Sequence, residues 1–182
     1  MRSLFTQMTE YHKQIKLYNS YMKAKIERQI SMTSSDDFNI PAFYVFRSTP
    51  YNKQLSVIPF EEGFLNNGCS YNSSSGVFIA PLKGIYFFYF QAIKIWGTPN
   101  HLNVRLLHNN EEVAAQHVST GNDAADGLVH LPLNMQSILL MEEGDTASMF
   151  LKSGIIDDRV ITPKQPWIHR FTSFTGFLLQ AL

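Results

Sequence analysis

Apolar positions are densest in residues 76–96, which read GVFIAPLKGIYFFYFQAIKIW. Aromatic and β-branched side chains dominate this stretch and Pro81 interrupts it, which favours strands over a helix. We therefore predict two central strands, residues 77–79 and 85–95, joined by a tight turn at residues 81–84.

Both faces of the second predicted strand are apolar. Because side chains alternate along a strand, one face would hold Tyr86, Phe88 and Phe90, and the other would hold Phe87, Tyr89 and Ile93. An antiparallel strand of an isolated sandwich usually turns one face to water. The second face therefore needs a cover, either a neighbouring subunit or loops and strands of the same chain.

Shorter alternating segments predict an all-β chain. The further expected strands are residues 42–47, 55–60, 101–108, 112–119, 128–140, 146–152 and 171–182. Asn109 and Asn110 suit a hairpin turn, and residues 61–68 read as another turn. About ten short strands with frequent turns fit a two-sheet antiparallel jelly-roll sandwich.

Residues 1–30 have a helical period instead. Apolar side chains recur at alternating steps of four and three, at Leu4, Met8, Tyr11, Ile15, Tyr18 and Met22. We predict a short N-terminal α-helix that forms a trimeric coiled-coil stalk, a linker at residues 31–40 and a globular domain at residues 41–182. A helix folded onto its own head and a basic helix on a membrane surface are the alternatives.

The charge composition limits the classes of partner that the protein is expected to bind. The 182 residues carry 15 basic and 15 acidic side chains, so no net field attracts nucleic acid. Residues 1–30 hold six basic and two acidic residues, a net +4, which leaves −4 for the remainder. No run of eighteen apolar residues is present, so no membrane-spanning helix is expected.

One cysteine, Cys69, excludes an intrachain disulfide and leaves a free thiol or a bridge between subunits. Residues 1–13 lack the apolar core of a secretory signal. If the protein is secreted, either the chain begins after its signal or Met1 was added.

The sequence contains few arrangements of residues that could support catalysis, and we expect that the protein is not an enzyme. The histidines His101, His108, His117, His130 and His169 lie singly on separate segments, without a His-x-His pair or an HExxH helix. This speaks against a cupin-type metal oxygenase, the competing enzyme hypothesis. No nucleophile elbow or phosphate-binding loop is present either.

Two acidic loops are better candidates for a ligand. Asp123 and Asp126 in one loop, with Asp157 and Asp158 in the other, could offer oxygen ligands to Ca²⁺, the one cofactor we consider. Asn72-Ser73-Ser74 is an acceptor motif for N-glycosylation if the chain is secreted.

Eight residues stand at fixed intervals along the chain: Phe60, Asn66, Tyr71, Phe78, Gly84, Tyr86, Phe88 and Phe90. On these positions the chain resembles the globular head domain of complement C1q, within the tumour necrosis factor-like superfamily. Residues 41–48 look like the family's first strand, residues 139–145 like its Leu-rich strand and following Gly-Asp, and residues 173–179, with Gly176 and Phe177, like its last strand.

The resemblance implies a secreted homotrimer that binds extracellular or microbial ligands through loops of its heads, as in innate immune pattern recognition. The ligand would be a glycan or a protein. A trimeric cytokine-like or cell-surface organising ligand for a protein receptor is one alternative, and a structural matrix protein is the other. The chain has no Gly-X-Y repeats, so complement activation through a collagen stalk is not expected.

Overall fold

The computed structural model describes residues 40–182 except Cys69 and residues 96–100, 120–129 and 157–170. Before residue 40 it describes seven α-helical residues, which are Lys13, Ile15, Lys16, Tyr18, Ser20, Met22 and Lys23. The chain separates into two units, Met1–Phe38 and Asn39–Leu182. Most of the predicted stalk and linker lies outside the described residues, so both stay predictions. Within the described part, no helix is long and apolar enough to cross a bilayer.

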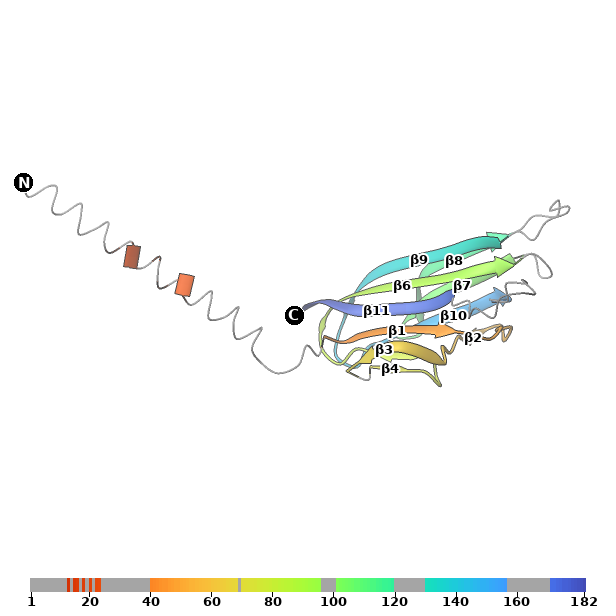
Figure 1. Cartoon of the computed structure of the whole chain (residues 1–182), viewed down its shortest axis with the longest axis horizontal. Coiled ribbons are helices and arrows are strands. Elements are labelled where there is room, and N and C mark those ends of the chain that lie inside the picture. Colours follow the sequence, from red (N-terminus) through yellow and green to blue (C-terminus); the bar gives the residue numbers. More distant parts are fainter. Residues whose placement is uncertain are drawn as a thin grey trace, which may run out of the picture. The chain divides into compact units, whose positions relative to one another are not determined.

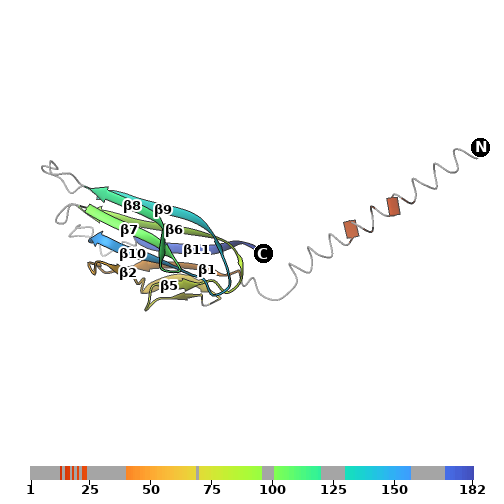
Figure 2. The ribbon, with the colours of Figure 1, turned by 180° about the vertical axis from the view of Figure 1, so that it is seen from behind.

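The second unit is a sandwich of two antiparallel sheets, which confirms the all-β prediction (Figures 1 and 2). Its described strands are β1 (Ala42–Arg47), β2 (Ser56–Val57), β3 (Glu62–Asn67), β4 (Tyr71–Asn72), β5 (Val77–Ile79), β6 (Gly84–Ile95), β7 (His101–His108), β8 (Glu111–Ser119), β9 (His130–Met141), β10 (Thr146–Gly154) and β11 (Thr172–Ala181). One sheet has the order β3-β1-β11-β6-β9, and the other has the order β4-β5-β10-β7-β8, with β2 also paired to β10.

Large apolar side chains fill the space between the sheets. Phe43 of β1 lies 4.9 Å, between ring centroids, from both Tyr71 of β4 and Phe174 of β11. Phe78 of β5 packs edge to face against Tyr86 of β6 at 5.5 Å. Aromatic pairs in these offset geometries add stability beyond the area that they bury.

The two central strands predicted at residues 77–79 and 85–95 are present as β5 and β6, with a short connection between them, but they do not pair with each other. β5 pairs with β4 and β10, whereas β6 pairs with β11 and β9 in the opposite sheet. The residues around Pro81 therefore carry the chain from one sheet to the other. Because Phe78 and Tyr86 meet across the core, their strands cannot be neighbours in one sheet.

Two further local predictions are corrected. Residues 62–67, expected as a turn, form β3 and pair with β1 through a bulge at Tyr44 and Val45. Only Ser56–Val57 of the predicted strand at residues 55–60 is extended. The Asn109–Asn110 turn is as predicted: both residues adopt positive φ, of 52° and 67°, between β7 and β8.

Candidate functional site

The five-stranded sheet presents an apolar outer face. Phe87 of β6 and Phe177 of β11 are register partners, and their ring centroids lie 5.3 Å apart. On the other side of Phe87, Ile138 of β9 is its partner and is 63% exposed. Ile85 and Leu140 form the next pair along these strands, and Leu140 is 57% exposed. An apolar surface of this kind on a single protomer marks an interaction site.

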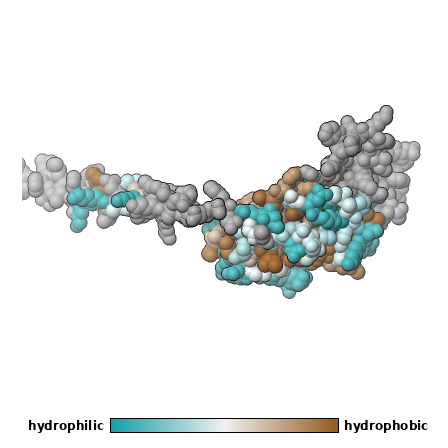
Figure 3. Space-filling model, turned by 60° about the horizontal axis from the view of Figure 1, so that its bottom comes forward, coloured by the Kyte–Doolittle hydropathy of each residue, from teal (hydrophilic) through white to brown (hydrophobic). Residues whose placement is uncertain are grey.

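An aromatic cluster extends this face to the β3 edge of the sheet. Phe64 of β3 stacks on Tyr44 of β1 at 5.7 Å and lies 5.1 Å from Phe46. Phe46 is almost fully buried beneath this contact, whereas Phe64 is 61% exposed. The surface of the head mixes apolar and hydrophilic patches (Figure 3). The sequence does not indicate this cluster, because the composition of residues 62–67 predicts a turn.

The part of the outer face that β1, β11, β6 and β9 form carries almost no charge. Strands β1, β11, β6 and β9 contain two charged side chains, Arg47 and Lys94, and both are buried. The Arg47 guanidinium donates to the carbonyl oxygens of Thr49 and Pro59 and pairs with Glu61 at 2.7 Å. An uncharged apolar sheet face can be covered by a protein partner without desolvating ions.

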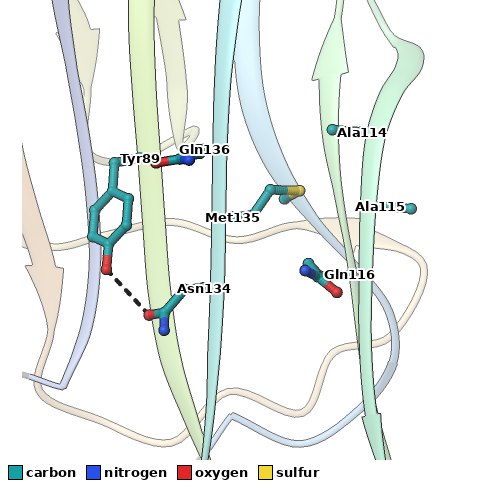
Figure 4. A pocket seen from close by; sticks show the side chains of 7 residues that line it. All are labelled: Tyr89, Ala114, Ala115, Gln116, Asn134, Met135 and Gln136. Atoms are coloured by element: carbon teal, nitrogen blue, oxygen red, sulfur yellow. Dashed lines mark hydrogen bonds between the residues drawn. The ribbon is translucent and has the colours of Figure 1, made fainter.

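A polar strip borders the apolar surface where the two sheets meet. The Tyr89 hydroxyl lies 3.1 Å from Asn134 Oδ1 and 3.4 Å from Gln91 Oε1. Beside it is a groove of about 420 Å³ between β9 and β8 (Figure 4). Its lining residues are Tyr89, Ala114, Ala115, Gln116, Asn134, Met135 and Gln136. None of them is charged, so the groove offers amides and a phenol and no acid–base pair.

The signature residues lie mostly on the inner side of the sheets. Phe60, Tyr71, Phe78, Tyr86, Phe88 and Phe90 are at most 3% exposed, and Gly84 and Gly176 are also buried. Asn66 holds Tyr71 through two hydrogen bonds, one to its carbonyl and one from its N–H. Burial raises the pKa of Tyr71, although the N–H of Phe60 donates to its hydroxyl over 3.3 Å.

Phe177 does not belong with these core residues. Its place in the last strand of the signature, next to Gly176, predicts a core residue, but Phe177 pairs with Phe87 on the outer face and is only partly buried. Gly176, its neighbour, is the residue that faces inward. A Cβ at Gly176 would lie 2.5 Å from Phe43 Cε1 and 2.7 Å from Phe88 Cδ1, which explains the glycine.

The predicted interface residues Phe87, Tyr89 and Ile93 are all partly buried on the outer face of β6, and their role in a trimer stays a prediction. Asn72 is exposed at the end of β4, and its glycosylation is likewise untested. The candidate calcium ligands Asp123, Asp126, Asp157 and Asp158 lie outside the described residues, as does Cys69. Among described residues, no group of three His, Cys, Asp or Glu could hold a metal.

A protein-family model for the C1q domain matches residues 42–179, most of the chain. The chain belongs to the C1q domain family. Members of this family are ligands and recognition proteins and not enzymes.

Among curated proteins, this C1q domain chain is similar to complement C1q tumor necrosis factor-related protein 2 of Mus musculus and of Homo sapiens. Identity to each is 30% over 146 residues, which is 77% of this chain and 43% and 45% of those proteins. The chain therefore matches less than half the length of either relative.

Solved structures show the same fold. The globular domain of zebrafish complement 1qA protein matches with a TM-score of 0.60 at 19% identity, over 79% of this chain and 99% of that one. The Eiger TNF of S. frugiperda matches with a TM-score of 0.58 at 10% identity, over 79% of this chain and 94% of that one. The C1q domain thus shares its sandwich with tumour necrosis factor-like proteins.

Proposed function

We propose that the protein is a secreted, homotrimeric recognition module that binds an extracellular ligand through its C1q heads. The observation that carries the proposal is the apolar outer face of β1, β11, β6 and β9, on which no Asp, Glu, Lys or Arg side chain is exposed. Contacts such as Phe87 with Phe177, and exposed side chains such as Ile138 and Leu140, suit burial against another copy.

Three copies are proposed because proteins of the C1q and tumour necrosis factor-like type typically assemble as trimers. Helices at residues 1–30 would add to the assembly, since heads that are already joined raise the effective concentration of the helices. Ile15 and Tyr18 of the predicted seam are 48% and 61% exposed in the single chain, so both are accessible to a partner helix.

The function would be binding, with specificity carried by loops on a rigid sandwich. A glycan or microbial surface is the first ligand class. A protein receptor is the second ligand class. An array of glycans and a capture experiment with cell-surface proteins separate the two classes.

The assembly is tested by the solution mass of the full chain, measured by light scattering during gel filtration. We expect about three times the 20.8 kDa of one chain. A monodisperse monomer at micromolar concentration would contradict the proposal, because the apolar face would then have no partner. Measurement at several concentrations separates a weak trimer from a true monomer.

A further inference from the structure

Two histidines that are sixteen positions apart in the sequence come together on the six-stranded sheet. His101 of β7 and His117 of β8 have ring centroids 6.1 Å apart and planes inclined by 28°. They are diagonal neighbours, since His117 is the register partner of Asn103. The two histidines are distant in the sequence and close in space because they lie on the two strands of one hairpin.

A third side chain joins the pair from the strand on the other side of β7. Ser153 of β10 has its Oγ 3.1 Å from His101 Nε2. Histidines that bind metals usually bond their second ring nitrogen to an oxygen, which fixes the ring orientation. Ser153 Oγ can orient the His101 ring in this way through Nε2. The other ring nitrogen of His101, Nδ1, is then available to bind an ion.

The pair is accessible and lies away from the proposed subunit interface. Leu102 and Val104 of β7 point into the core and are fully buried, so His101 lies on the outer face of this sheet. His117 is exposed on β8, which is the edge strand. The apolar interface face belongs to the other sheet, so this inference does not depend on the trimer.

Nearby charge does not oppose a cation strongly. Arg105 is the next outward position of β7 after Asn103, and its Nε lies 2.8 Å from Glu112 Oε1. This contact is an ion pair and not an aligned hydrogen bond, because within the described residues Arg105 Nε has no hydrogen-bond partner. Arg105 also donates to Asn103 Oδ1, so its guanidinium lies beside the register partner of His117, and the ion pair with Glu112 offsets its positive charge.

We propose that His101 and His117 form a binding site for a divalent transition-metal ion such as Zn²⁺, with water completing the coordination. Imidazole nitrogen is a preferred ligand of zinc, copper and nickel. With Zn–N bonds of about 2.0–2.1 Å, rings that share one ion have centroids roughly 5–6 Å apart. The observed 6.1 Å is close to this range, and His117 is the more exposed of the two rings that would turn toward a shared ion.

The test is isothermal titration of the full chain, stripped of metal, with ZnCl₂ in a non-chelating buffer. Wild type should take up one ion per chain at this site. His101→Ala and His117→Ala should each weaken that binding at least about tenfold, since even loss of an outer partner costs that much. His108→Ala is the matched control: it removes a histidine from the same strand, one that contacts Asp145 instead, and should leave zinc binding unchanged.

Three outcomes would overturn the site. Wild type could show no saturable uptake. The double variant His101→Ala/His117→Ala could bind zinc as tightly as wild type, which would assign the ion to other ligands. Only one of the two single replacements could weaken zinc binding, which would exclude an ion shared by both histidines. Circular dichroism of each variant should confirm that the sandwich is intact. Added Ca²⁺ should not compete with Zn²⁺ for the site, because calcium prefers oxygen ligands.

Discussion

The ring of Phe87 lies 5.3 Å from the ring of Phe177, across the β6–β11 ladder and on the outer face of the sheet. Replacing Phe87 by Ala should free the subunits while leaving each head folded, because its ring contributes to the proposed interface and not to the core. A hot-spot residue of this kind contributes about 2 kcal/mol or more, roughly thirtyfold in the dissociation constant. Gel filtration with light scattering measures the change in mass.

The adjacent residue provides the control for that experiment. Phe88 points to the opposite side of β6 and is 1% exposed among the core rings. Phe88→Ala should lower the free energy of unfolding by about 3–5 kcal/mol. If Phe87→Ala destabilises the head as much as Phe88→Ala does, or leaves the mass unchanged, the outer face is not the interface.

Gly176→Ala should destabilise the head, because the new methyl group would press on the rings of Phe43 and Phe88. Overpacking of this kind typically costs about 1–3 kcal/mol. Gly63→Ala is a matched control, since its nearest contact would be 3.3 Å, to a methyl of Val45. Denaturant unfolding of both variants should rank Gly176→Ala as clearly less stable, and equal stability would contradict the close approach seen in the core.

Tyr71→Phe should make the head less sensitive to alkaline pH. Burial raises the pKa of Tyr71, so above about pH 10 the unfolded chain releases the phenol proton while the folded head retains it. Stability from this group is therefore complete below pH 10 and declines as the pH rises further. The measurement is the free energy of unfolding of wild type and variant from pH 8 to 11, and parallel curves would refute the expectation.

Asn72 should carry an N-linked glycan when the chain passes through a eukaryotic secretory pathway. It is exposed, and its Oδ1 accepts hydrogen bonds of 3.0 Å from the N–H groups of Ser74 and Ser75. Ser74→Ala removes the hydroxyl of the acceptor motif but keeps that N–H, so the turn should persist. Mass spectrometry before and after enzymatic deglycosylation should show a shift for wild type and none for Ser74→Ala.

The local sequence patterns predicted much of the structure of the head. They failed where hydrogen bonds to a neighbouring strand outweigh the structural preference of the residues themselves. The bounds of β1 and β7 agree with the prediction, since the aromatic and β-branched run of β1 and the alternation of β7 are both local properties of the strand. β3 was missed because Glu62, Gly63 and the asparagines disfavour strands. Its hydrogen bonds to β1 outweigh that preference.

Tertiary structure also decided which residues meet. Phe87 and Phe177 are ninety positions apart in the chain, and no local period relates them. The same holds for His101, His117 and Ser153, which three strands bring together. The candidate metal site could therefore not be read from histidine spacing.

By itself the sequence determined the class of fold, the family and the two apolar sides of β6, because alternation and motif spacing are written along the chain. Only the folded sandwich decided that β5 and β6 belong to opposite sheets, that Phe177 faces outward and that the histidines meet. The reason is that a strand's partners depend on how all strands pack around one core, and that choice is made over the whole chain.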